Sequence, residues 1–124
     1  AKQMGPGHWE AYTDNGRERS HKNVLDWVKE VTLLGAGEIL LTSVDRDGTR
    51  KGFDCDLINS VSNLVSIPVN ASGGMGALED ITSVVNDGGA DSVVIASTFH
   101  YGDFNIAEVR KYALDVGLAV RENV

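Results

Sequence analysis

Short hydrophobic runs alternate with spaced apolar stripes along the chain, and this alternation predicts its secondary structure. Three runs, at residues 38–44, 67–71 and 92–96, are rich in β-branched residues and too short for ordinary helices, so they predict strands. Each run ends in small residues and is followed by apolar positions at helical spacing. Helices are therefore predicted from residue 54, over residues 78–87 and from residue 105. The positions expected to face inward in the first and last of these helices are Leu57, Ile58, Val61, Leu64, Ile106, Val109, Tyr112 and Ala113.

The first 35 residues predict a strand end, a hairpin and a helix. Residues 1–3 resemble the tail of a strand, and residues 8–12 predict a short strand before a hairpin-type turn at residues 14–16. An apolar stripe then predicts a helix over residues 20–34, with Ser20 as its N-cap and Gly35 as its stop. The hairpin is expected to be a short excursion from the first βα loop.

The resulting order, βαβαβαβα, predicts an α/β fold of four parallel βα units. Right-handed crossovers place all four βα loops on one face of the sheet. This is the layout of consecutive units in a (β/α)8 TIM barrel, where chemistry is carried by the loops after the strands. The chain has 124 residues, about half of a barrel of roughly 250 residues, so a single half-barrel domain over residues 1–124 is predicted.

Composition narrows the function classes. The net charge of −7 argues against a nucleic-acid partner, and no apolar stretch approaches the length of a membrane helix. The N-terminus shows no signal-peptide pattern, and a single cysteine, Cys55, suits a reducing cytoplasm. His8, His21 and His100 stand at unrelated spacings with no Cys or carboxylate pattern, so no metal site is predicted. No cofactor is predicted either.

The first candidate loop carries two carboxylates. Asp45 and Asp47 flank Arg46 directly after a predicted strand, and alternation along the chain would give both the same side. One of them can point into the barrel mouth as a general acid or base, and Gly48 lets the backbone approach an anion. The alternative interpretation of this segment is a solvated turn with an aspartate N-cap.

The second and third candidate loops are suited to phosphate. The segment Ser72, Gly73 and Gly74 exposes backbone N–H groups between a strand and a helix, although a tight βα turn would have the same composition. Ala96 and Ser97 follow the last strand in the same way. Many barrels bind phosphate between the loops of their last two strands, so the pair predicts a site for a phosphorylated small molecule.

Four segments resemble a known family, the cyclase subunit of imidazole glycerol phosphate synthase. They are GAGEILLTSVDRDGT at residues 35–49, GFD at 52–54, IPVNASGG at 67–74 and ASTFH at 96–100. The resemblance covers nearly the whole chain and runs to the C-terminal half of that enzyme. The related isomerase of the same pathway shares the Asp-Gly-Thr and Ser-Gly-Gly elements. The residues at 52–54 and the excursion at 9–12 are more similar to the cyclase.

The resemblance implies a lyase of histidine biosynthesis, built as a barrel of two similar halves with a phosphate grip in each. Such an enzyme converts a ribulosyl phosphate and ammonia, which a separate glutaminase supplies, into imidazole glycerol phosphate and an aminoimidazole carboxamide ribotide. It implies that Asp47 is catalytic or positions substrate, and that Glu38 belongs to the ammonia entrance. The implied phosphate ligands are Gly48, Gly74, Ala96 and Ser97, with Asp45, Ser72 and Gly73 beside the substrate.

The chain also departs from the family pattern. In the family, two principal aspartates end the first and fifth strands, and the fifth-strand motif reads Asp-Ala-Lys, whereas this chain begins Ala1-Lys2. Asn70 stands where an aliphatic residue is usual. Three interpretations follow: half of a cyclase that is inactive alone, a self-associating phosphate-binding half-barrel without turnover, and, ranked last, a truncated isomerase-like enzyme. The open strand edges and apolar surface of a half-barrel predict a homodimer or a larger homo-oligomer.

Overall fold

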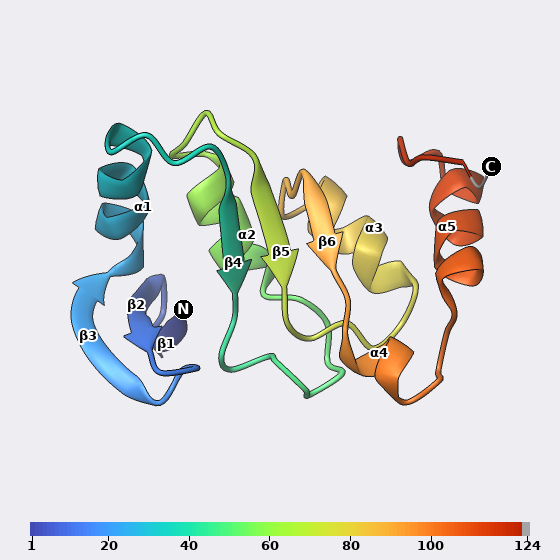
Figure 1. The fold of residues 1–124 in the computed structure, drawn as a ribbon, viewed down its shortest axis with the longest axis horizontal. Coiled ribbons are helices and arrows are strands. Elements are labelled where there is room, and N and C mark those ends of the chain that lie inside the picture. Colours follow the sequence, from blue (N-terminus) through green and yellow to red (C-terminus); the bar gives the residue numbers. More distant parts are fainter. Residues whose placement is uncertain (123–124) are drawn as a thin grey trace.

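The computed structural model describes residues 1–122 and contains two three-stranded sheets (Figure 1). The N-terminal part forms β1 (Lys2–Gly5), β2 (His8–Thr13) and β3 (Glu18–Asn23), followed by α1 (Val24–Leu33). The rest alternates strands and helices: β4 (Ile39–Thr42), α2 (Cys55–Ser62), β5 (Val69–Ser72), α3 (Glu79–Asn86), β6 (Ser92–Val94), α4 (Ser97–His100) and α5 (Ile106–Asp115).

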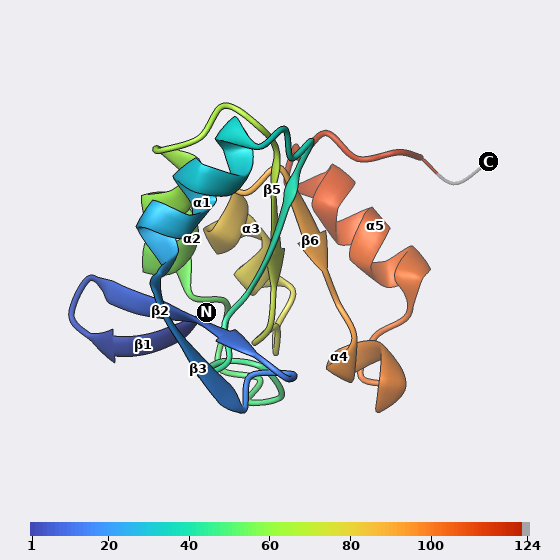
Figure 2. The same cartoon turned by 60° about the vertical axis from the view of Figure 1, so that its left-hand side comes forward.

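The N-terminal strands form an antiparallel sheet in the order β1-β2-β3, which contacts α1 (Figure 2). The predicted hairpin turn is confirmed, and its residues Asp14, Asn15 and Gly16 all have positive φ. Inside the sheet, two hydrogen bonds from Arg19 to the carboxylate of Glu10, at 3.2 and 2.7 Å, lower the pKa of Glu10 to about 2. These contacts tie β2 to β3 through side chains as well as through the backbone.

The prediction that a helix begins at Ser20 is wrong. Ser20 lies in β3, where its hydroxyl donates to the carbonyl of Ala11 on β2. The helix begins after Asn23, whose side chain accepts hydrogen bonds from the backbone N–H groups of Leu25 at 2.8 Å and Asp26 at 3.2 Å. Both serine and asparagine favour N-caps, and the cross-strand pairing decides between them.

The second sheet is parallel, with β5 between β4 and β6. Four parallel βα units are not confirmed, because among residues 1–122 this sheet has three strands and residues 2–5 pair antiparallel with β2 instead. Ala1 alone extends the parallel pattern. Its N–H donates to the Thr42 carbonyl at 2.7 Å, and its carbonyl accepts from the Val44 N–H at 2.8 Å, which is how one residue of a parallel strand would pair beside β4.

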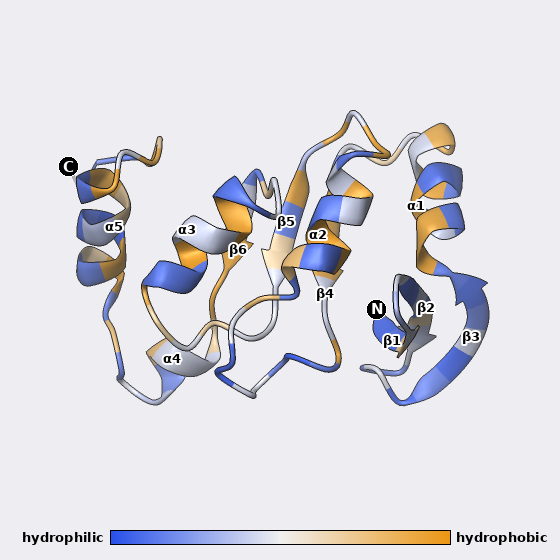
Figure 3. Ribbon diagram, turned by 180° about the vertical axis from the view of Figure 1, so that it is seen from behind, coloured by the Kyte–Doolittle hydropathy of each residue, from blue (hydrophilic) through white to orange (hydrophobic). Residues whose placement is uncertain are grey.

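The core lies between the parallel sheet and the helices α2 and α3, which cover one of its faces (Figures 1 and 3). Alternate strand residues point toward these helices, among them Leu41 and Ala71, and they pack in one cluster with Leu57, Val61 and Val84. Among residues 1–122, no helix covers the opposite face (Figure 1). Its outward positions are Leu40, Thr42, Asn70, Ser72, Ser92 and Val94, and the side chains of Leu40 and Val94 are 62% and 43% exposed.

Two expected inward positions point outward. Leu64 is 40% exposed because α2 ends at Ser62, before the helical stripe reaches it. Ile106 is 56% exposed at the first residue of α5, where the capping box of Asn105 and Glu108 sets the helix start. The short helix α4 lies within the segment that the sequence indicated only as a loop.

Candidate functional site

The loops that follow β4, β5 and β6 meet at the carboxyl end of the parallel sheet (Figure 1). They enclose a cavity of about 30 Å³. Its lining comprises Asp47, Ser72, Gly73, Gly74, Met75, Val94, Ile95, Ala96, Ser97 and Thr98. Most of the predicted site residues therefore lie together, although they come from three separate segments of the sequence.

The loop after β4 separates the two carboxylates. Asp47 lines the cavity, and its N–H donates to the Ser43 carbonyl at 2.9 Å. The carboxylate of Asp45 instead accepts a hydrogen bond of 2.7 Å from the Gln3 backbone N–H in the antiparallel sheet. The alternation expected of these two residues does not apply, because the chain turns at residues 44–49 rather than continuing as a strand. Gly48 lies beside Asp47 in this turn and does not line the cavity.

The glycines of the second loop allow two backbones to touch. Gly74 has a φ of 112°, its carbonyl accepts a hydrogen bond of 2.8 Å from the Gly52 N–H, and a Cβ on it would lie 2.2 Å from the Gly52 carbonyl oxygen. A Cβ on Gly73 would lie 2.9 Å from the Ser43 carbonyl oxygen. The loop after β5 is thus held directly against the loop that carries Asp47.

The third loop opens the short helix α4, with Ala96 at its N-cap position and Ser97 as its first residue. Because the first N–H groups of a helix have no acceptor within the helix, this end offers donors at the cavity edge. Thr98 is fully buried, and its hydroxyl lies 4.0 Å from the sulfur of Met75. Thr98 and Met75 were not singled out as site residues. Their place directly after Ser97 and Gly74 is the only sequence signal that pointed to them.

Asp47 also borders a second and larger hollow, of about 420 Å³. The other residues around it are Ala1, Tyr12, Asn15, Gly16, Thr42 and Val44. The hairpin after β2 therefore forms one wall of this hollow, and Asp47 stands between it and the small cavity.

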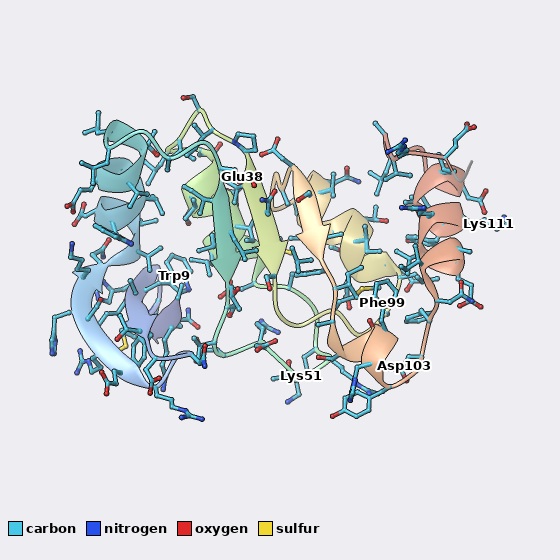
Figure 4. The ribbon with its side chains drawn as sticks, in the orientation of Figure 1. Trp9, Glu38, Lys51, Phe99, Asp103 and Lys111 are labelled. Atoms are coloured by element: carbon cyan, nitrogen blue, oxygen red, sulfur yellow. The ribbon has the colours of Figure 1, made fainter. Side chains whose placement is uncertain are left out.

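Glu38 lies at the opposite end of the sheet from this cavity (Figure 4). Its carboxylate accepts a hydrogen bond of 3.1 Å from the Asn70 amide, whose oxygen accepts one of 2.6 Å from the Ser92 hydroxyl. All three residues belong to the uncovered side of the sheet. Asn70, unusual by comparison with the family pattern, thus has a polar partner on each side.

These features define an α/β protein with a parallel three-stranded sheet, compatible with a partial βα barrel, and a small cavity at the carboxyl end of its strands. Residues 1–105 match the family described as "Histidine biosynthesis protein". The chain belongs to this family, which consists of histidine biosynthesis enzymes. Within residues 1–122, no helix is long and apolar enough to cross a membrane, and no three His, Cys, Asp or Glu residues are grouped to hold a metal ion.

The close contact at Gly74 generates a first prediction. Gly74→Ala should destabilise the protein by more than ~1 kcal/mol, since its Cβ would collide with the Gly52 carbonyl and alanine rarely adopts this φ. Gly37→Ala is the matched control, because no atom lies within 4 Å of its added Cβ. Urea unfolding of both variants measures the difference. Equal free energies of unfolding for the two variants would contradict the packing of the two loops.

Proposed function

We propose that this chain is the C-terminal half of an imidazole glycerol phosphate synthase cyclase, acting in histidine biosynthesis as part of an ammonia-dependent cyclisation and lyase reaction. The observation that carries the proposal is the meeting of Asp47, Gly74 and Ser97 around one cavity. The family match supports the pathway, and the geometry of the cavity supports a phosphorylated substrate.

Phosphate binding in this proposal rests on backbone groups. The chain carries a net charge of −7, and the cavity lining contains no Lys or Arg. N–H groups of Gly74, Ala96 and Ser97 would hold the phosphate oxygens, because glycine-rich loops and helix starts present such donors. Gly48, one residue from Asp47, is proposed as a further N–H donor, which would require the anion to extend beyond the lining of the small cavity. The cytoplasm, where free Cys55 is stable, is the proposed location.

Asp47 is the proposed acid–base or positioning group. A phosphate in the small cavity would direct the rest of the substrate into the larger hollow that Asp47 borders. A carboxylate at that boundary can accept a proton from the reacting part of the substrate or orient it. Glu38, at the far end of the sheet, is proposed to belong to an ammonia entrance that a glutaminase subunit would feed.

A contact between two segments favours the cyclase over the related isomerase. The indole N–H of Trp9 donates to the Asp54 carboxylate at 3.3 Å, and the same carboxylate accepts from the Leu57 N–H to cap α2. Trp9 and Asp54 belong to the hairpin and to the residues at 52–54, the two segments that are more similar to the cyclase. Trp9 is only 2% exposed, and its indole is hydrogen-bonded to the Asp54 carboxylate. The two segments therefore form one structural unit.

The second candidate function is a self-associating phosphate-binding half-barrel without turnover. The uncovered sheet face, with Leu40 and Val94 exposed, favours it. Ala1 makes the two hydrogen bonds of a parallel strand beside β4, and this supports parallel pairing at that edge. A second copy of the chain is the proposed occupant, because a two-fold arrangement would cover both uncovered faces at once.

Phosphate titration tests the anion site. Amide resonances of Gly74, Ala96 and Ser97 should shift at millimolar phosphate, because their N–H groups would donate to the anion. Chloride at equal ionic strength is the control and should leave them unchanged. An NMR titration in which phosphate moves none of these amides would refute the site.

Turnover tests the catalytic assignment. A polypeptide of these 124 residues should form negligible imidazole glycerol phosphate from the ribulosyl substrate and ammonium salts, since Asp47 is the one carboxylate in the cavity lining. Adding a polypeptide with the first half of a cyclase should restore turnover, and Asp47→Asn should then reduce it by ~10²–10⁴-fold. Restored isomerase activity in place of cyclisation would overturn the cyclase assignment.

Light scattering tests self-association. We expect a mass of at least twice 13.3 kDa at micromolar concentration, with more than ~1,000 Å² buried between copies. Leu40→Glu should shift the protein toward monomer by placing a charge on the uncovered face. Leu33→Glu, on α1 and 89% exposed, is the matched control that should not. A stable, folded monomer of the unmodified chain would rule out the dimer.

A further inference from the structure

Arg50 connects two loops of the candidate site that the sheet does not join. Its guanidinium lies 3.1 Å from the carboxylate of Asp103 and 4.8 Å from the centre of the Tyr101 ring. We propose that Arg50 is a positioning residue, which clasps the loop carrying Asp47 to the segment after α4 and thereby fixes Asp47 relative to Ser97. This inference rests on the proposed phosphate site. Arg50 itself does not line the cavity.

The contacts of Arg50 connect two loops that the strand pairing of the sheet leaves unconnected. β4 and β6 each pair with β5 and not with each other, so no strand ladder connects the loop after β4 to the loop after β6. Backbone hydrogen bonding reaches from the first loop to the second through Gly52 and Gly74. Arg50, in the first loop, contacts Tyr101 and Asp103 in the segment after α4. The first loop is therefore connected to both other loops around the cavity.

The first end of the clasp, at Arg50, is closely packed. Arg50 has a φ of 57°, a conformation that residues with a side chain rarely adopt and that persists where the surroundings fix it. The surroundings are visible here: a Cβ on Gly76 would lie 2.1 Å from the Arg50 carbonyl oxygen, so the two backbones are in direct contact. Thr49 adds a turn hydrogen bond of 2.9 Å from its N–H to the Arg46 carbonyl.

The second end of the clasp is tied to α4. The backbone N–H of Asp103 donates to the Thr98 carbonyl at 2.9 Å, and Thr98 is fully buried next to Ser97. Asp103 is therefore hydrogen-bonded to a residue that lines the cavity. Figure 4 shows Asp103 and Lys51, the neighbour of Arg50 in sequence, at the same end of the molecule.

The partners of Arg50 also explain why it would affect phosphate binding through the position of the loops and not by contacting the anion. Its side chain is 41% exposed and that of Asp103 is 34% exposed, so the pair is partly screened by water. The carboxylate neutralises the guanidinium, and the ring of Tyr101 occupies one side of it. Arg50 is thus committed to holding the loops, and it does not itself line the cavity.

The test uses the whole chain and two measurements. In buffer without phosphate, Arg50→Ala should raise hydrogen exchange in residues 45–52 and 97–103 together, because each segment loses its contact with the other. In an NMR titration, the same variant should bind phosphate roughly threefold to tenfold more weakly. Asp103→Asn should have a similar effect, and the double variant should add little to either single change. Arg50→Lys should restore part of the affinity, since it keeps a cation beside Asp103.

Lys51→Ala is the matched control. It removes the same charge from the next residue, so it should leave exchange unchanged and phosphate affinity within about twofold. Equal weakening by Lys51→Ala and Arg50→Ala would show a general charge effect and would overturn the clasp. Unchanged exchange in Arg50→Ala would overturn it as well. If the unmodified chain shows no phosphate shifts, the proposed phosphate site fails, while the exchange measurement still decides whether Arg50 holds the loops.

Discussion

Parallel pairing around β5 is the constraint on which the rest of the structure depends. Because β4, β5 and β6 run in the same direction, each connection must cross back to the other end of the sheet, and α2 and α3 do so on the same face. The loops that follow the strands then converge at one end. That convergence places Asp47, Gly74 and Ser97 around one cavity, although 27 and 23 positions separate them in turn along the chain.

The same arrangement leaves one side of the sheet without a helix. Apolar residues such as Leu40 and Val94 face outward there, beside the polar group of Glu38, Asn70 and Ser92. In a closed barrel this side would be the interior, and polar residues inside a barrel need hydrogen-bond partners. Asn70 already has such partners, because its amide donates to Glu38 and accepts a hydrogen bond from Ser92. This polar group is therefore suited both to the present exposed state and to one in which a second half-barrel covers the face.

Local chemistry predicted some elements correctly and failed where two signals competed. The helices α2 and α5 begin after Asp54 and Asn105, where the sequence predicts helix starts. The side chains of both residues cap these helices by accepting hydrogen bonds from N–H groups three residues away. Ser20 carries the same signal, but it is drawn into β3 by pairing with β2. The alternation that would have brought Asp45 and Asp47 to one side failed because residues 44–49 form turns, and Gln3 holds Asp45 away from the cavity.

The sequence by itself determined the strand–turn–helix order of residues 38–115 apart from the short helix α4, the glycines required at the ends of the strands, and the resemblance to histidine biosynthesis enzymes. Those features depend on periodicity, backbone freedom and short-range hydrogen bonds, which adjacent residues specify. Only the tertiary structure decided which carboxylate reaches the cavity, that Ala1 pairs beside β4, and that Arg50 contacts Asp103. Ala1 and Thr42 lie 41 positions apart in the sequence, and Arg50 and Asp103 lie 53 apart, so the geometry of these contacts follows from how the sheet and its crossovers pack.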